Sequence, residues 1–354
     1  MDSIRRKLYF LISVVAALAL AGPAQATFPG VNGKIAVERG NETAESDIYV
    51  VDPDGTDEVN LTHNGGNNRV IAWSPDGSRV AFRSDGDGSD NYYDIFVAPA
   101  DGSGPVRLTY LENAGNPAWS PDGASITFVN DYLYTIGADG TGLRRLSDLV
   151  RAEAPVWSPD GRKIVFKVDT VTRWDLYVVN RDGSGLRRLT DDADEFPAWP
   201  SFSPDGTRIV YATNRDPACT AYDCYTLYVM DADGTHERKL TEGPVFYATW
   251  APDGSRIAFS SSRGYEFDVY TIAPDGTGEQ RLTYTAASES PPQWSPDSTQ
   301  LVFTRNNSVY VMNRDGTGER FLTFGGGQQW QSLPDKHAKR RCKAKKHRLR
   351  CKAR

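Results

Sequence analysis

A segment close to Trp-Ser-Pro-Asp-Gly recurs six times in this chain of 354 residues, and this repetition constrains the fold more than any other feature. The copies begin at Trp73, Trp119, Trp157, Phe202, Trp250 and Trp294, with separations of 46, 38, 45, 48 and 44 residues. A period of this length suits a propeller blade of four antiparallel strands and is too long for most helical solenoid repeats. The repeat therefore predicts an all-β propeller.

Each copy is followed by the same series of short strands and turns. Two alternating runs come first, such as Lys163–Phe166 and Asp175–Val178, and an Asp-Gly turn then leads to an Arg-Leu-Thr segment such as Arg188–Thr190. Alternation of β-branched and aromatic residues between Pro-Asp-Gly and Asp-Gly turns is typical of strand–turn–strand units. We name the four predicted strands of each unit a, b, c and d in chain order.

Strand a, which carries the marker aromatic residue, is predicted to line the central channel. Prolines lie on it at positions 117, 155, 197, 291 and 292, and several of its other residues are alanines. Proline cannot donate a hydrogen bond to a sheet ladder, so it belongs on an edge strand, and small residues suit the crowded axis. The marker tryptophans are expected to pack between blades and not to hold a ligand. Trp174 lies outside the repeat, which makes it a candidate for an exposed role, although packing between blades is favoured for it too.

The number of blades follows from the two ends of the repeat array. Strands b, c and d occur seven times, whereas the first unit, which begins at Lys34, has no strand a before it. The segment Gln328–Asp335 resembles a degraded marker, so Trp330 is predicted to supply the missing strand. Pairing of this kind closes the ring and removes its open edges. Seven blades are therefore expected, and six blades with one unit outside the ring is the alternative.

The first residues resemble a secretory signal. Arg5, Arg6 and Lys7 precede an apolar stretch from Leu8 to Leu20, and residues 24–26 read Ala-Gln-Ala. This pattern predicts a signal peptide over residues 1–26 and a propeller over residues 27–335, with an uncleaved N-terminal anchor as the alternative. No later segment approaches the roughly 20 apolar residues of a membrane span. The expected location is the periplasm or the exterior.

Charge separates the predicted propeller from the C-terminal tail. Residues 336–354 hold eleven of the forty basic residues and no acidic residue, which predicts a disordered tail able to contact anionic surfaces. Residues 28–335 carry 26 basic and 45 acidic residues, a net charge of −19 within a chain whose total is −6. An acidic body repels nucleic acid and attracts cations or basic partners.

The Trp-Ser-Pro-Asp-Gly, Asp-Ile-Tyr-Val and Arg-Leu-Thr segments resemble the propeller repeat of the TolB family over roughly residues 33–335. The resemblance implies a propeller with protein contacts in the bacterial envelope. Members of that family carry an α/β domain before a six-bladed propeller. Here only a few residues separate the predicted cleavage site from the first strand, so that domain is expected to be absent.

Candidate binding residues are placed by the face on which each loop emerges. Antiparallel strands put the a–b and c–d turns on one face, the bottom, and the b–c loops and d–a connections on the other, the top. Loops that vary between repeats are the usual location of binding residues. The predicted top-face residues are the acidic Glu153, Asp192, Asp194, Glu195 and Glu289, and the aromatic Tyr222 and Tyr225. Cys219 and Cys224 are predicted to form a disulfide beside the two tyrosines. The alternatives are that the acidic residues are solvated surface charges and that the disulfide only stabilises a long loop.

The sequence favours a non-enzymatic scaffold over an enzyme. His63 and His236 are predicted to lie on opposite faces, so they cannot share a metal, and no Gly-x-Ser-x-Gly motif is present. No catalytic residue, metal or cofactor is predicted. The expected function is recognition of an envelope protein or polymer through the top face by a monomer. The alternative is a polysaccharide lyase or glycoside hydrolase that uses top-face carboxylates.

Overall fold

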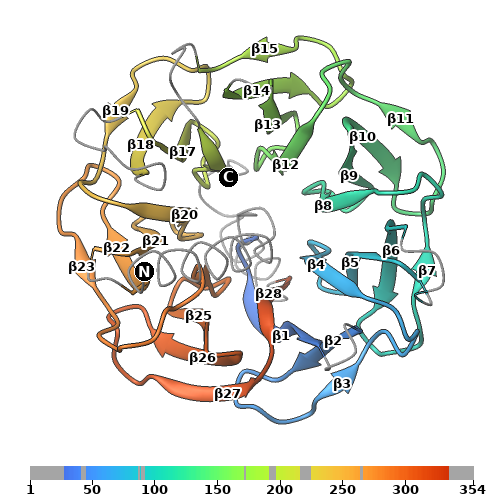
Figure 1. Ribbon diagram of the computed structural model, residues 1–354, viewed down its shortest axis with the longest axis horizontal. Coiled ribbons are helices and arrows are strands. Elements are labelled where there is room, and N and C mark those ends of the chain that lie inside the picture. Colours follow the sequence, from blue (N-terminus) through green and yellow to red (C-terminus); the bar gives the residue numbers. More distant parts are fainter. Residues whose placement is uncertain are drawn as a thin grey trace, which may run out of the picture.

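The computed structural model describes residues 28–40, 45–86, 88, 92–170, 173–190, 197–215, 225–263 and 266–334. Its strands form seven sheets, each of four antiparallel strands, arranged as blades around a central axis (Figure 1). Within the described residues every regular element is a strand. The seven-bladed propeller predicted from the repeat is confirmed.

The strands of each blade are given from the channel outward. Blade 1 contains β28 (Gly326–Leu333), β1 (Val31–Gly40), β2 (Ser46–Val51) and β3 (Val59–Asn60); blade 2 contains β4 (Asn68–Trp73), β5 (Arg79–Ser84), β6 (Asp94–Pro99) and β7 (Val106–Arg107); blade 3 contains β8 (Gly115–Trp119), β9 (Ser125–Asn130), β10 (Tyr132–Gly137) and β11 (Arg144–Arg145).

The remaining blades follow the same order. Blade 4 contains β12 (Ala152–Trp157), β13 (Lys163–Asp169), β14 (Trp174–Asn180) and β15 (Arg187–Arg188); blade 5 contains β16 (Ala198–Phe202), β17 (Arg208–Thr213), β18 (Thr226–Asp231) and β19 (Arg238–Lys239); blade 6 contains β20 (Val245–Trp250), β21 (Ile257–Ser261), β22 (Asp268–Ile272) and β23 (Gln280–Arg281); blade 7 contains β24 (Gln293–Trp294), β25 (Gln300–Arg305), β26 (Ser308–Asn313) and β27 (Arg320–Phe324).

The Asp and Arg-Leu-Thr positions of the repeat fasten the two outer strands of a blade. In blade 2 the carboxylate of Asp94, which is fully buried, accepts hydrogen bonds from the Thr109 hydroxyl (2.5 Å) and from Arg107 (2.5 Å). The Thr109 hydroxyl in turn accepts a hydrogen bond from the backbone N–H of Ile95 at 2.9 Å. A buried carboxylate needs such partners, which explains why these residue types recur together in the repeat.

The marker tryptophans connect neighbouring blades. Trp119 donates its indole N–H to the carbonyl oxygen of Ala72 in the preceding blade (3.0 Å), and Trp157 does the same to Ala118 (3.3 Å). Both side chains are buried. The predicted role of these residues in packing between blades is confirmed, and in these two blades the indole both fills the space between blades and hydrogen-bonds across it.

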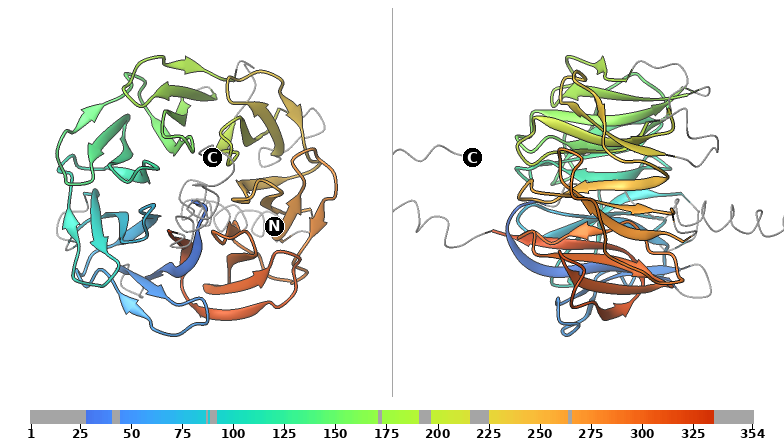
Figure 2. Two further views of the ribbon diagram at one scale, coloured as in Figure 1. Left: turned by 180° about the vertical axis from the view of Figure 1, so that it is seen from behind. Right: turned by 90° about the vertical axis from the view of Figure 1, so that its left-hand side faces the viewer.

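The ring is closed by β28, which comes from the C-terminal end of the described chain and pairs antiparallel with β1 (Figure 2). Trp330 lies opposite Ile35 in this pairing and is only 1% exposed. The side chain of Gln331 accepts a hydrogen bond from the N–H of Lys34 (2.7 Å) and donates one to the carbonyl of Gly77 in blade 2 (2.6 Å). The predicted closure through Trp330 is confirmed, and the six-bladed alternative is wrong.

Candidate functional site

Six of the seven inner strands contain a β-bulge in their top half. In β16, for example, Trp199 and Pro200 together lie opposite the single residue Tyr211, because Ala198 pairs with Ala212 and Ser201 with Val210. The same register shift occurs in β28, β4, β8, β12 and β20. Bulges redirect side chains and are common beside functional sites. The bulges therefore form a ring of redirected positions around the top of the channel.

The first bulge residue has a left-handed backbone in each of these strands. These residues and their φ angles are Gly327 (55°), Val70 (60°), Asn116 (51°), Ala154 (48°), Trp199 (52°) and Tyr247 (47°). A non-glycine residue in this conformation costs about 1–2 kcal/mol relative to the right-handed region. The side chains at these equivalent positions differ completely in chemistry, and only blades 5 and 6 place aromatic rings there.

Trp199 and Tyr247 belong to a cluster of four aromatic residues on the channel side of blades 5 and 6. We call this cluster the aromatic shelf and define it as Trp199, Tyr225, Phe246 and Tyr247. The ring centroid of Trp199 lies 4.4 Å from Tyr247, 5.3 Å from Tyr225 and 5.7 Å from Phe246. Trp199 is partly exposed, whereas the other three are buried. Burial raises the pKa of Tyr225 to about 12, so its hydroxyl stays protonated at physiological pH.

A charged pair borders the aromatic shelf on the side of blade 4. Glu153 in β12 and Lys167 in β13 form an ion pair of 2.6 Å, and the ammonium group of Lys167 also lies 3.8 Å from the centroid of the Trp174 ring. The Glu153 side chain is 48% exposed, whereas that of Lys167 is 10% exposed. Burial raises the pKa of Tyr247, and the negative charge of Glu153 raises it further, which places Glu153 near the shelf. Trp174 packs against the same core cluster that contains the buried residues of the shelf.

Glu289 lies in blade 7 and is not brought together with Glu153. Its carboxylate is buried and accepts hydrogen bonds from Arg305 (2.7 Å), Thr285 (2.7 Å) and Thr283 (3.0 Å). Burial raises the pKa of Glu289, while the hydrogen bonds from Thr285 and Arg305 oppose that rise. The described contacts of this carboxylate are therefore internal to the protein.

Several predicted features lie outside the described residues. These are the signal peptide, the basic tail, Asp192, Asp194, Glu195, Tyr222, and the cysteine pair Cys219 and Cys224. Their assignments stay predictions. Of the predicted binding residues, Glu153, Tyr225 and Glu289 are described, and only Glu153 and Tyr225 border the same region.

Trp199 and Tyr247 were not predicted from the sequence as binding residues. A signal was present, because both residues precede a marker aromatic by three positions, where blades 3, 4 and 7 have Asn116, Ala154 and Pro291. The contact between their rings could not be foreseen, because 48 residues separate them and the bulges direct their side chains.

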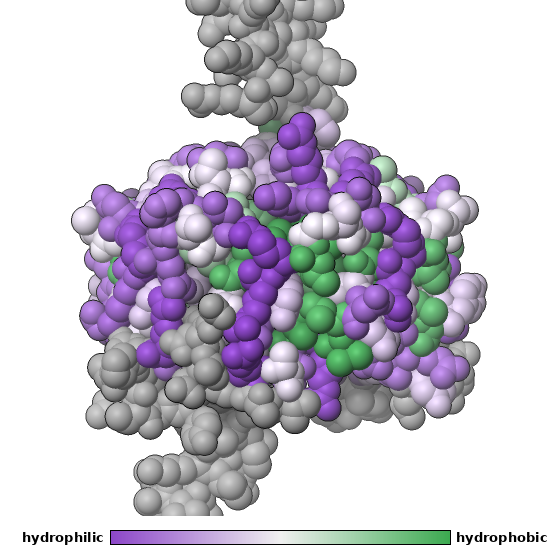
Figure 3. Space-filling view, turned by 90° about the horizontal axis from the view of Figure 1, so that it is seen from above, coloured by the Kyte–Doolittle hydropathy of each residue, from purple (hydrophilic) through white to green (hydrophobic). Residues whose placement is uncertain are grey.

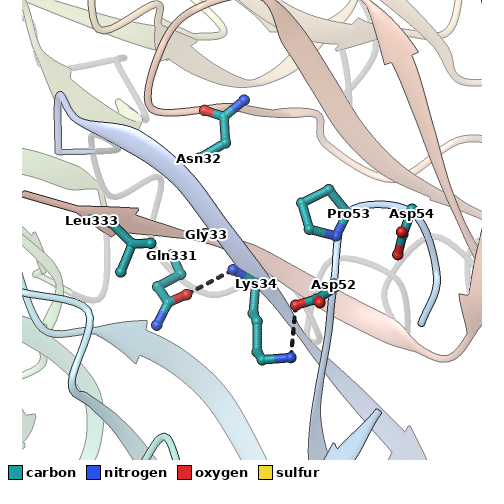
Figure 4. A pocket seen from close by; sticks show the side chains of 8 residues that line it. All are labelled: Asn32, Gly33, Lys34, Asp52, Pro53, Asp54, Gln331 and Leu333. Atoms are coloured by element: carbon teal, nitrogen blue, oxygen red, sulfur yellow. Dashed lines mark hydrogen bonds and ion pairs between the residues drawn. The ribbon is translucent and has the colours of Figure 1, made fainter. Parts of the chain in front are cut away.

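A hollow lies on the bottom face at the ring closure (Figure 4). It has a volume of about 500 Å³ and is lined by Asn32, Gly33, Lys34, Asp52, Pro53, Asp54, Gln331 and Leu333. The ammonium group of Lys34 is bound to Asp52 at 2.7 Å, and the Gln331 side chain is bound to backbone groups of Lys34 in blade 1 and Gly77 in blade 2. These polar groups serve the closure, so this hollow is a weaker candidate than the aromatic shelf.

The outer rim presents a different kind of surface. An edge-on view shows apolar groups between polar stripes (Figure 3). The exposed large apolar side chains of the described residues are spread over several blades, and they include Val106, Leu143, Leu186, Tyr284 and Phe324. Scattered apolar residues of this kind are normal on a protein surface. The aromatic shelf, in contrast, is confined to one sector of the channel.

Among the described residues no group of three or more His, Cys, Asp or Glu side chains is arranged to hold a metal ion. None of the described segments forms a helix that is long and apolar enough to cross a membrane.

The closed ring, its tryptophan-marked blades and the bulged channel strands define a seven-bladed β-propeller assembled from one repeated unit. The chain belongs to the TolB β-propeller domain family, which matches residues 27–200 and 198–334. The resemblance drawn from the repeat is thereby confirmed.

Individual proteins of known sequence match this chain at lower than 30% identity and over only part of its length. The uncharacterized protein Atu1656 of Agrobacterium fabrum is 29% identical over 152 residues, which are 39% of this chain and 50% of that protein. The Tol-Pal system protein TolB of Francisella tularensis is 26% identical over 116 residues, 30% of this chain and 27% of that protein. The chain thus spans half or less of the length of these relatives.

A solved structure shows the same fold at lower identity. The structure of an oligogalacturonate lyase in complex with manganese superposes with a TM-score of 0.62 at 14% identity, and the match covers 84% of this chain and 86% of the lyase. At this identity the likeness concerns the fold alone, because propellers support many unrelated functions.

Proposed function

We propose that this protein is an exported, non-enzymatic binding scaffold that recognises a protein or a polymer of the cell envelope through its top face and channel mouth. The aromatic shelf is the observation that carries this proposal. A repeated ring has one sector in which two adjacent blades place Trp199 and Tyr247 at left-handed bulge positions. Membership of the TolB β-propeller family supports a recognition role.

The residues of the shelf have the properties of binding anchors. Tryptophan and tyrosine dominate the energetics of many interfaces because they bury a large area and lose little conformational entropy. The Trp199 ring packs against the three other rings of the shelf and remains partly exposed, so it is preorganised for contact with a ligand.

Two further elements of the proposal concern location. The basic, then apolar, then Ala-Gln-Ala pattern of residues 1–26 supports export to the periplasm or the exterior. The basic tail, residues 336–354, contacts anionic surfaces by charge attraction. Removal of residues 336–354 should weaken binding to vesicles of anionic phospholipid at low salt and have little effect at high salt. Equal binding by the truncated and full-length proteins would contradict the role of the tail.

Recovery of partners from envelope extracts tests the proposed scaffold role. Trp199→Ala should reduce the recovery of any specific partner, whereas Tyr284→Ala, which removes an exposed aromatic ring from the d–a connection between blades 6 and 7, serves as the matched control. A second variant replaces Glu153, Asp194 and Glu195 by alanine and tests the predicted acidic mouth; Glu289 is kept because its carboxylate is buried beside Arg305. Equal recovery of every partner by the wild type and both variants would reject recognition through the top face.

A further inference from the structure

We propose that the aromatic shelf is a binding site for an uncharged saccharide, in which a pyranose ring stacks on the partly exposed Trp199 and its hydroxyl groups bind the Glu153–Lys167 pair. This inference rests on the proposed function, because it names the class of ligand for the same face. Three properties of the site lead to it: an aromatic platform, a charge-neutral polar border and aromatic side chains at the bulge positions of two adjacent blades.

The platform is suited to the apolar face of a sugar ring. The face of an indole carries partial negative charge, and the C–H groups on one side of a pyranose carry partial positive charge, so the two surfaces attract each other. Trp199 is braced by Tyr247 at 4.4 Å and by Tyr225 at 5.3 Å, which fixes the orientation of the indole. A fixed, partly exposed indole offers a flat surface without further ordering.

The polar border favours an uncharged ligand over a basic one. Glu153 is paired with Lys167 at 2.6 Å, and the same ammonium group occupies the face of Trp174 at 3.8 Å. A lysine or arginine of a partner would therefore have to displace an internal cation from its carboxylate. A sugar hydroxyl needs no such exchange, because it donates to the exposed carboxylate of Glu153 and accepts from an ammonium group. The ion pair thus matches the mixed donor and acceptor character of a saccharide.

The bulge positions of blades 5 and 6 differ from those of the other blades in their side chains and not in their backbone. Six inner strands have a left-handed residue at this position, and it is valine in blade 2 and alanine in blade 4, so the backbone conformation belongs to the repeat. Trp199 and Tyr247 are the aromatic residues among these six, and their ring centroids lie 4.4 Å apart. The repeat therefore supplies the conformation, and the choice of aromatic side chains in two adjacent blades supplies the platform.

Titration with defined probes tests the class of ligand. The full chain is titrated by calorimetry with cellohexaose and chitohexaose as uncharged probes, trigalacturonate as an anionic probe and hexalysine as a cationic probe. The uncharged probes should bind, and Trp199→Ala should weaken that binding about ten-fold or more. Tyr284→Ala should leave it unchanged. Should Trp199→Ala lose its fold, as judged by its circular dichroism spectrum, Trp199→Phe keeps a smaller ring and should weaken binding by a lesser factor.

Two outcomes of the titration would overturn the inference. One is the absence of binding by both uncharged saccharides to the wild type. The other is binding of hexalysine or trigalacturonate that depends on Trp199 and is tighter than that of either uncharged probe. Glu153→Gln keeps a hydrogen-bonding side chain but unpairs Lys167, so it should shift the preference from uncharged toward anionic probes.

Competition by free saccharides in envelope extracts separates this inference from the proposed function. The extract is incubated with an excess of cellohexaose or chitohexaose before capture by the protein. Capture that requires Trp199 and is abolished by either saccharide supports both ideas. Capture that requires Trp199 but is unaffected by both saccharides retains the scaffold role and overturns the saccharide. Capture that is indifferent to Trp199 overturns the saccharide, and the scaffold role is overturned as well if the acidic variant also recovers every partner.

Discussion

Glu38 offers a test of how the ring closure depends on pH. This residue lies in β1 opposite Gly326 of β28, and its carboxylate accepts a hydrogen bond of 2.6 Å from the N–H of Val70 in blade 2. Burial raises the pKa of Glu38 from 4.5 to about 7, against the lowering effects of the Val70 hydrogen bond and of the nearby charges of Arg69 and Arg83. Gly327 makes room for this side chain, since a Cβ there would lie 2.4 Å from Cδ of Glu38.

The sign and size of the effect follow from the raised pKa. Between pH 4.5 and 7 the folded protein keeps a proton that the unfolded chain releases, so the free energy of unfolding falls as the pH rises through this window. The stabilising contribution is fully present below pH 4.5 and is lost above pH 7. A change from 4.5 to about 7 corresponds to about 3 kcal/mol, at 1.36 kcal/mol for each pKa unit.

Glu38→Gln removes the titration and keeps an oxygen that can accept the hydrogen bond from Val70. We expect the variant to unfold in urea with about the same free energy as the wild type near pH 4.5 and to be more stable by up to about 3 kcal/mol above pH 7. Glu58→Gln is the control of opposite sign, because the hydrogen bond from Arg39 lowers the pKa of Glu58. A difference between the wild type and Glu38→Gln that stays constant across this window would refute the reasoning.

Three further predictions concern stability. Trp330→Ala should lower the free energy of unfolding by about 3–5 kcal/mol in urea titrations, because the side chain is 1% exposed. The exposed Tyr284→Ala is the control and should change it by less than about 0.5 kcal/mol; an equally small effect of Trp330→Ala would contradict closure through Trp330. Gly33→Ala should lower the free energy of unfolding by about 1–2 kcal/mol, because the new Cβ would lie 2.2 Å from Oε1 of Gln331 and displace the acceptor of the Lys34 N–H. The effects of Gly33→Ala and Gln331→Ala should be less than additive in the double variant, and full additivity would disprove the clash. The hydrogen bond from Arg181 lowers the pKa of Asp122 to about 2, so the stability that this carboxylate confers is present above pH 3.8 and is lost as the pH falls toward 2. In Asp122→Asn the free energy of unfolding should therefore depend less on pH in this range, and an unchanged pH dependence would contradict the pairing.

The fold was predictable from the sequence because one unit is repeated and each copy contains the local sequence signals of its turns and strands. The Pro-Asp-Gly and Asp-Gly turns are local signals, and the alternating runs between them report which side chains face inward. The closure was predictable for the same reason, since the repeat lacked one strand at its start and Trp330 supplied a marker at its end.

The tertiary structure alone decided what the channel mouth presents. From the sequence, Glu153 and Glu289 were equivalent carboxylates before a channel strand, but the fold pairs one with Lys167 at a half-exposed position and buries the other beside Arg305. The aromatic shelf joins residues from two blades, and the β-bulges that direct Trp199 and Tyr247 toward each other leave no local mark in the sequence. Sequence repetition specifies the unit and its order around the ring, whereas the neutralisation of charges and the contact of distant rings arise only when the units are packed side by side.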